Sequence, residues 1–91
     1  MQANISILGQ PWKVEHVAGP ADEYGTCDPD ARTITINPCG KVNLEAVELH
    51  EVIHAILSVT GVVHLLTDAE EEAIATALEH GLIGAGYRRT T

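Results

Sequence analysis

The sequence predicts a single α+β domain in which a small antiparallel twisted sheet is followed by two helices. Three observations favour this fold class. The 91 residues are too few for two hydrophobic cores, so residues 1–91 are expected to form one domain. Short apolar or alternating segments bounded by turn residues precede position 40, and helical periodicity follows it. No repeat, low-complexity tract or linker interrupts this order.

Four short segments in the first part of the chain are typical of strands. An apolar run at 5–8 and an alternating segment at 12–17 are separated by the breaker residues between them. A shorter candidate lies at 24–27, and the segment at 33–37 is the clearest because it alternates and is rich in β-branched residues. A turn signal predicts that the last two strands form a hairpin across residues 28–32.

Two helices are predicted in the second part. Asn43 is a favourable N-cap for a helix at 44–60, and Gly61 is suited to end it. Apolar residues occur almost all round its later turns, so we expect this helix to be covered on several sides. After a loop of about six residues, the residues 67–70 have the spacing of a capping box, which predicts a second helix from about Asp68.

The composition excludes several classes of protein. Five Lys and Arg against 13 Asp and Glu give a net charge of −8, which argues against binding to nucleic acid or to an anionic membrane surface. No apolar run approaches the ~18–20 residues of a membrane span, and no signal peptide is visible, so a cytoplasmic location is expected. Cys27 and Cys39 are expected to be free thiols.

The residues His50-Glu51-Val52-Ile53-His54 form an H-E-x-x-H pattern inside the first predicted helix. Residues four apart on a helix differ by about 40° in azimuth and about 6 Å in rise, so both imidazoles can bind one ion. Glu51 lies about 100° away, where it can take a proton from a water that zinc has made acidic. About 0.03 occurrences of the pattern are expected by chance. The alternative is a pair of hydrogen-bonded core histidines.

A third protein ligand would complete such a site. The candidates are Glu70, Glu71, Glu72, His64 and His80. Ile74, Ala75, Leu78 and Leu82 define an apolar stripe, and Glu71 projects within roughly 10° of its direction. A carboxylate in a core-facing stripe needs a cation, whereas the neighbours of Glu71 are explained as solvated residues of a first turn. The sequence therefore predicts Glu71 as the third ligand, with Glu70, Glu72 and His64 as alternatives, and places His80 on the far side.

Two further sets of residues are candidates for a metal site or for hydrogen bonds to a reaction intermediate. A structural zinc site made of Cys27, Cys39 and the two histidines is disfavoured, because the usual close spacing of cysteine ligands is absent. Four side chains could each donate a hydrogen bond to a tetrahedral intermediate, but such residues are more often plain surface or packing residues, so none is assigned this role. They are Tyr24, Arg32, His64 and Tyr87.

The chain resembles the small phage-type zincin metallopeptidases akin to the ImmA/IrrE group of gluzincins. The resemblance is carried by the segments 24–28, 32–37, 48–57 and 71–74 and by Gly61. The similarity covers residues 5–83. The resemblance implies zinc bound by His50, His54 and Glu71, with Glu51 as the base. It also implies that an extended substrate adds beside an edge strand, here the strand ending at Asn37. The chain lacks the sensor and helix-turn-helix parts of larger members, and it lacks the metzincin continuation after the second histidine.

We therefore expect a zinc-dependent metalloendopeptidase that binds Zn²⁺ and acts on a protein or peptide substrate. The first alternative is a catalytically silent zincin-fold protein that binds zinc and acts in protein–protein interaction or phage assembly, since a fold alone does not establish a function. The second is an acidic interaction module, such as a nucleic-acid mimic, in which the H-E-x-x-H pattern is accidental. The sequence specifies neither the substrate nor the oligomeric state.

Overall fold

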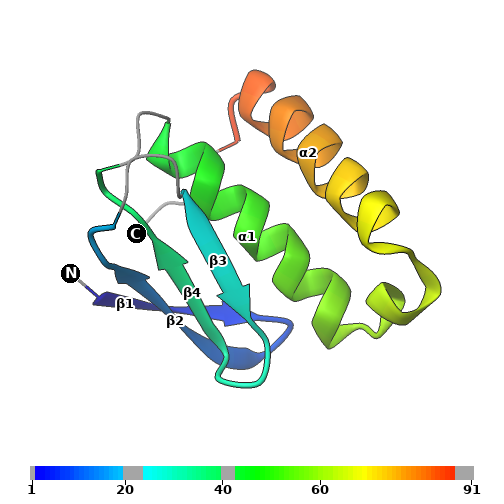
Figure 1. Cartoon of the computed structure of the whole chain (residues 1–91), viewed down its shortest axis with the longest axis horizontal. Helices are drawn as coiled ribbons and strands as arrows, with labels where there is room; N and C mark the ends of the chain where they lie inside the picture. The colour runs from blue at the N-terminus through cyan, green and yellow to red at the C-terminus, as the bar shows by residue number, and fades with distance from the viewer. Residues whose placement is uncertain (1, 20–23, 40–42, 88–91) are drawn as a thin grey trace.

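The computed structural model describes residues 2–19, 24–39 and 43–87, and it has an α+β architecture as predicted. The elements are β1 (Gln2–Ile7), β2 (Gln10–His16), β3 (Gly25–Asp28), β4 (Thr33–Ile36), α1 (Leu44–Val59), the 3₁₀ helix η1 (Val62–Leu65) and α2 (Asp68–Gly84). Figure 1 shows three layers, with α1 lying between the sheet and α2. The expectation that the first helix is covered on several sides is therefore confirmed.

The sheet is mixed, with the strand order β1-β2-β4-β3. Two antiparallel hairpins, β1–β2 and β3–β4, are joined through β2 and β4, which run parallel with Val14 opposite Ile34. The predicted hairpin across residues 28–32 is confirmed, but the prediction of an antiparallel sheet is wrong. Alternating apolar residues show which face of a strand is buried, but the same alternation suits a parallel or an antiparallel neighbour. The order of the strands was therefore not encoded in that pattern.

The edge strand next to α1 is β3, which pairs with β4. The strand that ends before Asn37 is β4, and it lies between β2 and β3. The expectation that this strand forms the edge is wrong, because both of its sides are already hydrogen-bonded to neighbouring strands. Gly25 and Cys27 are half-buried, whereas Thr26 and Asp28 are exposed.

The first helix begins and ends at local signals that the sequence predicted, and the second helix begins at one. Asn43 Oδ1 accepts hydrogen bonds from the backbone N–H groups at the start of α1, 2.9 Å from Glu45 N, and Gly61 follows its end with a left-handed φ of 79°. At α2 the capping box is present, because Thr67 and Glu70 exchange side-chain-to-backbone hydrogen bonds of 3.1 and 2.8 Å. Within the described ranges, no helix is both long and apolar enough to cross a membrane.

The hydrophobic core lies between the sheet and α1. Its buried members are Ile7, Trp12, Val14, Ile34, Ile36, Val47 and Ala55. The second helix packs against α1 and buries one residue, Ala75, among its described positions. Ile74, Leu82 and Ile83 of α2 are half-buried, and polar side chains of α2 also contact α1.

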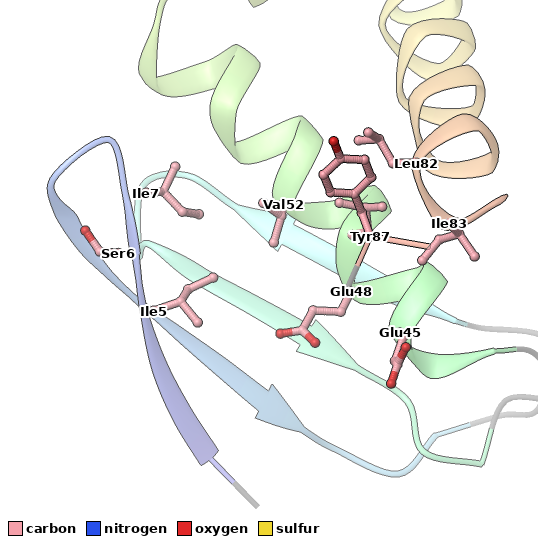
Figure 2. A pocket seen from close by; sticks show the side chains of 10 residues that line it. Ile5, Ser6, Ile7, Glu45, Glu48, Val52, Leu82, Ile83 and Tyr87 are labelled. Carbon is pink, nitrogen blue, oxygen red and sulfur yellow. The ribbon is translucent and has the colours of Figure 1, made fainter. Parts of the chain in front are cut away.

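A separate cavity of about 480 Å³ lies between β1, α1 and the end of α2. Figure 2 shows Ile5 and Ile7 on one side of it and Leu82 and Ile83 on another, with the Tyr87 ring near Leu82. None of the histidines lines this cavity. Tyr87 therefore does not lie with the H-E-x-x-H residues.

Candidate metal centre

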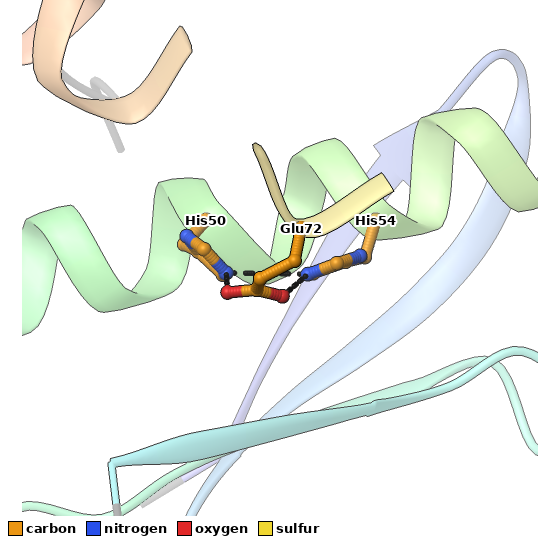
Figure 3. Close-up of side chains that lie close together, drawn as sticks. All are labelled: His50, His54 and Glu72. Atoms are coloured by element: carbon orange, nitrogen blue, oxygen red, sulfur yellow. Dashed lines mark hydrogen bonds and ion pairs between the residues drawn. The ribbon is translucent and has the colours of Figure 1, made fainter. Parts of the chain in front are cut away.

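The two histidines of the H-E-x-x-H pattern point the same way from successive turns of α1 (Figure 3). The Nε2 atoms of His50 and His54 are 3.2 Å apart, and their ring centroids are 4.9 Å apart. Both side chains are largely buried, with exposed fractions of 12% and 16%. The predicted convergence of the two imidazoles is therefore found in the structure.

The carboxylate of Glu72 spans the two Nε2 atoms. Its Oε1 lies 2.8 Å from Nε2 of His50, and its Oε2 lies 3.1 Å from Nε2 of His54. Among the described residues, His50, His54 and Glu72 form the group whose ligand atoms lie close enough together to hold a metal ion, all within 4.8 Å of one another. Glu72 was an open alternative for the third ligand, and the structure brings it to the histidines.

Glu71, the residue that the sequence predicts as third ligand, contacts the opposite nitrogen. Its Oε2 lies 2.5 Å from Nδ1 of His54 and therefore on the far side of that ring from Glu72. Glu71 is half-buried, with a side chain that is 19% exposed against 59% for Glu72. Glu71 is thus the less exposed of the two glutamates, whereas Glu72 is the one that lies next to both Nε2 atoms.

Glu79 has the matching position at the other histidine, and it is not among the residues that the sequence predicts. Its Oε1 lies 2.9 Å from Nδ1 of His50. Glu79 comes about two helical turns after Glu72, so both side chains lie on one face of α2. The i, i+7 spacing of Glu72 and Glu79 is the sequence signal that could have identified Glu79 as a second glutamate on this face.

The donor chemistry fits a divalent cation. Glu71 and Glu79 contact Nδ1 of His54 and His50, and a neutral imidazole that donates from Nδ1 to a carboxylate presents its Nε2 lone pair, here toward Glu72. In this form His50, His54 and Glu72 present three ligand atoms that could hold one metal ion. Zinc–nitrogen bonds of about 2.0–2.1 Å in tetrahedral geometry place two nitrogens roughly 3.3 Å apart, close to the 3.2 Å observed.

Glu51 lies beside this group, on the side of α1 that faces β3. It is 9% exposed, and it lines a hollow of about 410 Å³ together with His50, His54 and Glu72. A Cβ atom placed on Gly25 would lie 3.5 Å from Cγ of Glu51, which shows how closely β3 approaches the glutamate. Glu51 therefore has the position expected of a base that is not itself a ligand.

The electrostatics of the site oppose further negative charge. Burial raises the pKa of Glu51 above its ordinary value, and the charges of Glu72 and Glu79 act in the same direction, although the two histidines oppose them. Burial alone would lower the pKa of His54, but the hydrogen bond with Glu71 and the nearby carboxylates outweigh it, so this pKa is raised. The shift of Glu51 thus reflects its burial first, whereas the shift of His54 reflects the neighbouring carboxylates.

The remaining candidates lie elsewhere or have other partners. Glu70 is occupied in the capping box, whose hydrogen bonds from Thr67 lower the pKa of this carboxyl. His64 lies exposed in η1, and His80 is 73% exposed. Cys27 and Cys39 are free thiols, as predicted, and neither belongs to the group near the histidines.

Of the four candidate hydrogen-bond donors, Tyr24 lines the same hollow as His50 and Glu51. Arg32 lies in the turn between β3 and β4, where its φ of 48° places the backbone in the left-handed region. Tyr24 is therefore the candidate that lies next to the group, although no hydrogen bond from its hydroxyl identifies a role.

Comparison of the chain with protein-family models, with curated proteins and with solved structures gives no match.

Proposed function

We propose that this protein is a zinc-dependent metalloendopeptidase of the zincin type. The observation that carries the proposal is the convergence of His50 Nε2, His54 Nε2 and the Glu72 carboxylate beside a buried Glu51 that is not a member of the group. Two histidines and a glutamate, with a position left open for water, are a donor set of catalytic zinc sites. We infer that Glu72 rather than Glu71 supplies the carboxylate ligand.

Each residue of the site has a role in this proposal. When bound, zinc supplies a Lewis acid that makes a water molecule acidic and polarises the carbonyl of the scissile bond. Glu51 takes the proton from the water and transfers it to the leaving amine. Glu71 and Glu79 hold the imidazoles through Nδ1, so that Nε2 of each ring stays unprotonated and correctly oriented.

The substrate is expected to lie along β3. An extended peptide can add to the free edge of a sheet through backbone hydrogen bonds, and β3 is the edge strand that packs against α1. Because Gly25 has no side chain, β3 lies close enough to α1 to bring that edge next to Glu51. A peptide bond held there would face the metal ligands.

The test compares Glu51→Gln with the unmodified chain, both loaded with zinc and incubated with a proteome-derived peptide library. We expect Glu51→Gln to keep its zinc in elemental analysis and to produce no new peptide N-termini by mass spectrometry. The control is Glu45→Gln, an exposed glutamate in the first turn of the same helix, which should retain cleavage. Undiminished cleavage by Glu51→Gln would refute the proposal. A zinc-loaded chain that cleaves nothing would favour the catalytically silent alternative.

A further inference from the structure

Two hollows lie on either side of the histidine pair and follow β3. The Tyr24 hollow, of about 410 Å³, is lined by Tyr24 and Gly25 at the start of the strand and by Glu79. The Cys27 hollow, of about 470 Å³, is lined by Cys27 and Pro29 at the end of the strand and by Glu71. Glu51 and His54 line both hollows. A chain that follows β3 therefore passes from one hollow to the other across the candidate metal centre.

The walls of these hollows are strongly negative. Glu51, Glu72 and Glu79 line the first, and Glu51 and Glu71 line the second. No lysine or arginine of the described ranges lines either hollow. Of the described basic residues, Lys13 lies in β2, two strands away from β3, and Arg32 lies in the β3–β4 turn.

A bound metal ion does not cancel this charge. Four glutamates surround the place of one divalent cation, and the whole chain has a formal net charge of −8. Asp28 and Asp30 add exposed carboxylates at the end of β3. A substrate with acidic side chains would therefore be repelled, and one with basic side chains would be attracted.

The Tyr24 hollow adds an aromatic wall to this charge. Tyr24 is 48% exposed, and it lines this hollow together with Glu72 and Glu79. An ammonium or guanidinium group is attracted to an aromatic ring and can at the same time pair with a carboxylate. The combination of ring, carboxylates and available volume suits a long basic side chain better than an apolar one.

We propose that the substrate of this site is a basic peptide segment, with a lysine or arginine side chain held in the Tyr24 hollow between Tyr24 and Glu79. The proposal rests on the proposed peptidase function for the position of the peptide along β3. It adds the chemical class of the substrate and makes Tyr24 a residue that determines specificity.

The test measures binding separately from cleavage. Zinc-loaded Glu51→Gln is titrated with three dye-labelled peptides that differ only at two positions, which hold Arg, Gln or Glu. We expect the Arg peptide to bind at least about tenfold more tightly than the Gln peptide, with the advantage shrinking between about 0.05 and about 0.5 M NaCl. Equal affinities, a preference for the Gln or Glu peptide, or no measurable binding would each overturn the proposal.

Two variants of the same protein test the Tyr24 hollow. In the Glu51→Gln background, Tyr24→Leu should lose several-fold of the preference for Arg over Gln. Tyr87→Leu should keep it, because Tyr87 is exposed but lines the cavity on the other side of α1. Equal preferences in the two variants would remove Tyr24 from the proposal.

Cleavage by the unmodified chain distinguishes this inference from the proposed function. Cleavage of all three peptides at equal rates supports the peptidase and refutes the basic substrate. Tight binding of the Arg peptide without cleavage refutes the peptidase and leaves the basic binding site in place.

Discussion

Nδ1 of His50 lies 2.9 Å from Oε1 of Glu79, and this contact repeats at the other histidine, where Nδ1 of His54 faces Glu71. Each imidazole is thus held between two carboxylates of α2, because Glu72 faces both Nε2 atoms. Carboxylates that bind the second ring nitrogen set the tautomer and the orientation of a metal-binding histidine. The helix α2 therefore both completes the group and orients it.

The three glutamates of α2 are expected to differ in their effect on zinc binding. Glu72→Ala should lower the affinity by more than roughly 100-fold, because a ligand is lost, whereas Glu71→Ala and Glu79→Ala should each lower it by about 10–100-fold. Competition with a chromophoric chelator measures all three, and Glu45→Gln serves as the unaffected control. A larger loss in Glu71→Ala than in Glu72→Ala would return the ligand role to Glu71, as the sequence predicts.

The stability of the zinc-free protein should fall as the pH rises. Glu51 and His54 both have a raised pKa in the folded chain, from ordinary values of 4.5 and 6.5. For each group the stabilising contribution is present below its ordinary pKa and is lost as the pH rises through the raised value. The melting temperature of chelator-treated protein, measured from about pH 5 upward, reports this loss of stability. The exposed His64→Gln should show the same slope, and a rise in stability with pH would contradict the prediction.

The zinc-loaded protein should show the opposite slope over the same range, because protons compete with zinc for the imidazoles and carboxylates. Zinc at 1,000 times its dissociation constant would stabilise the fold by about 4 kcal/mol. The gap between the melting temperatures of loaded and chelated protein is therefore expected to widen with pH. A gap that is absent at every pH would mean that no metal binds.

Local signals made the helices and the histidine pair predictable. Three signals each act within a few residues: Asn43, Gly61 and the Thr67–Glu70 capping box. Both ends of α1 and the start of α2 could therefore be predicted from the sequence. The convergence of His50 and His54 likewise depends only on helix geometry. The parallel pairing of β2 with β4 joins residues that are distant in the chain, and no local pattern specifies it.

The rotation of α2 about its axis explains why the sequence favoured Glu71, whereas the structure brings Glu72 to the two Nε2 atoms. The predicted stripe was centred on apolar residues, yet Leu78 within it is 45% exposed. The face that meets α1 carries Glu71, Ala75 and Glu79 and is rotated by roughly 40° from the predicted direction. Apolar periodicity cannot locate a helix face whose partners are imidazoles, because the carboxylates on it count as polar.

The two cysteines are expected to differ sharply in reactivity. Burial raises the pKa of Cys27 to about 12, and the charges of Glu51, Glu71 and Asp28 add to the effect. At about pH 8 only about one in 10,000 of its thiols is then ionised, and the thiolate is the reactive form. Cys39 is exposed. Iodoacetamide should therefore give one adduct, at Cys39, by intact and peptide mass spectrometry, and both residues should react in urea. Equal native rates would contradict the placement of Cys27.

Gly25 should be intolerant of a side chain, because β3 passes so close to α1. A Cβ atom at this position would lie 2.9 Å from the carbonyl oxygen of Thr35 and 3.0 Å from Cγ1 of Val47. The first of these neighbours is backbone and cannot rotate away, so Gly25→Ala should cost about 1–3 kcal/mol of unfolding free energy.

The measurement is thermal unfolding, in which 1 kcal/mol corresponds to about 4–8 °C for a domain of this size. The matched control is Gly81→Ala within α2, where a Cβ atom meets nothing within 4 Å. This variant should gain about 0.5–1 kcal/mol, because alanine favours a helix over glycine. Since Gly25→Ala changes no metal ligand, it should still bind zinc but position β3 farther from Glu51. A Gly25→Ala variant as stable as the unmodified chain would show that β3 is not held against α1 as closely as the structure indicates.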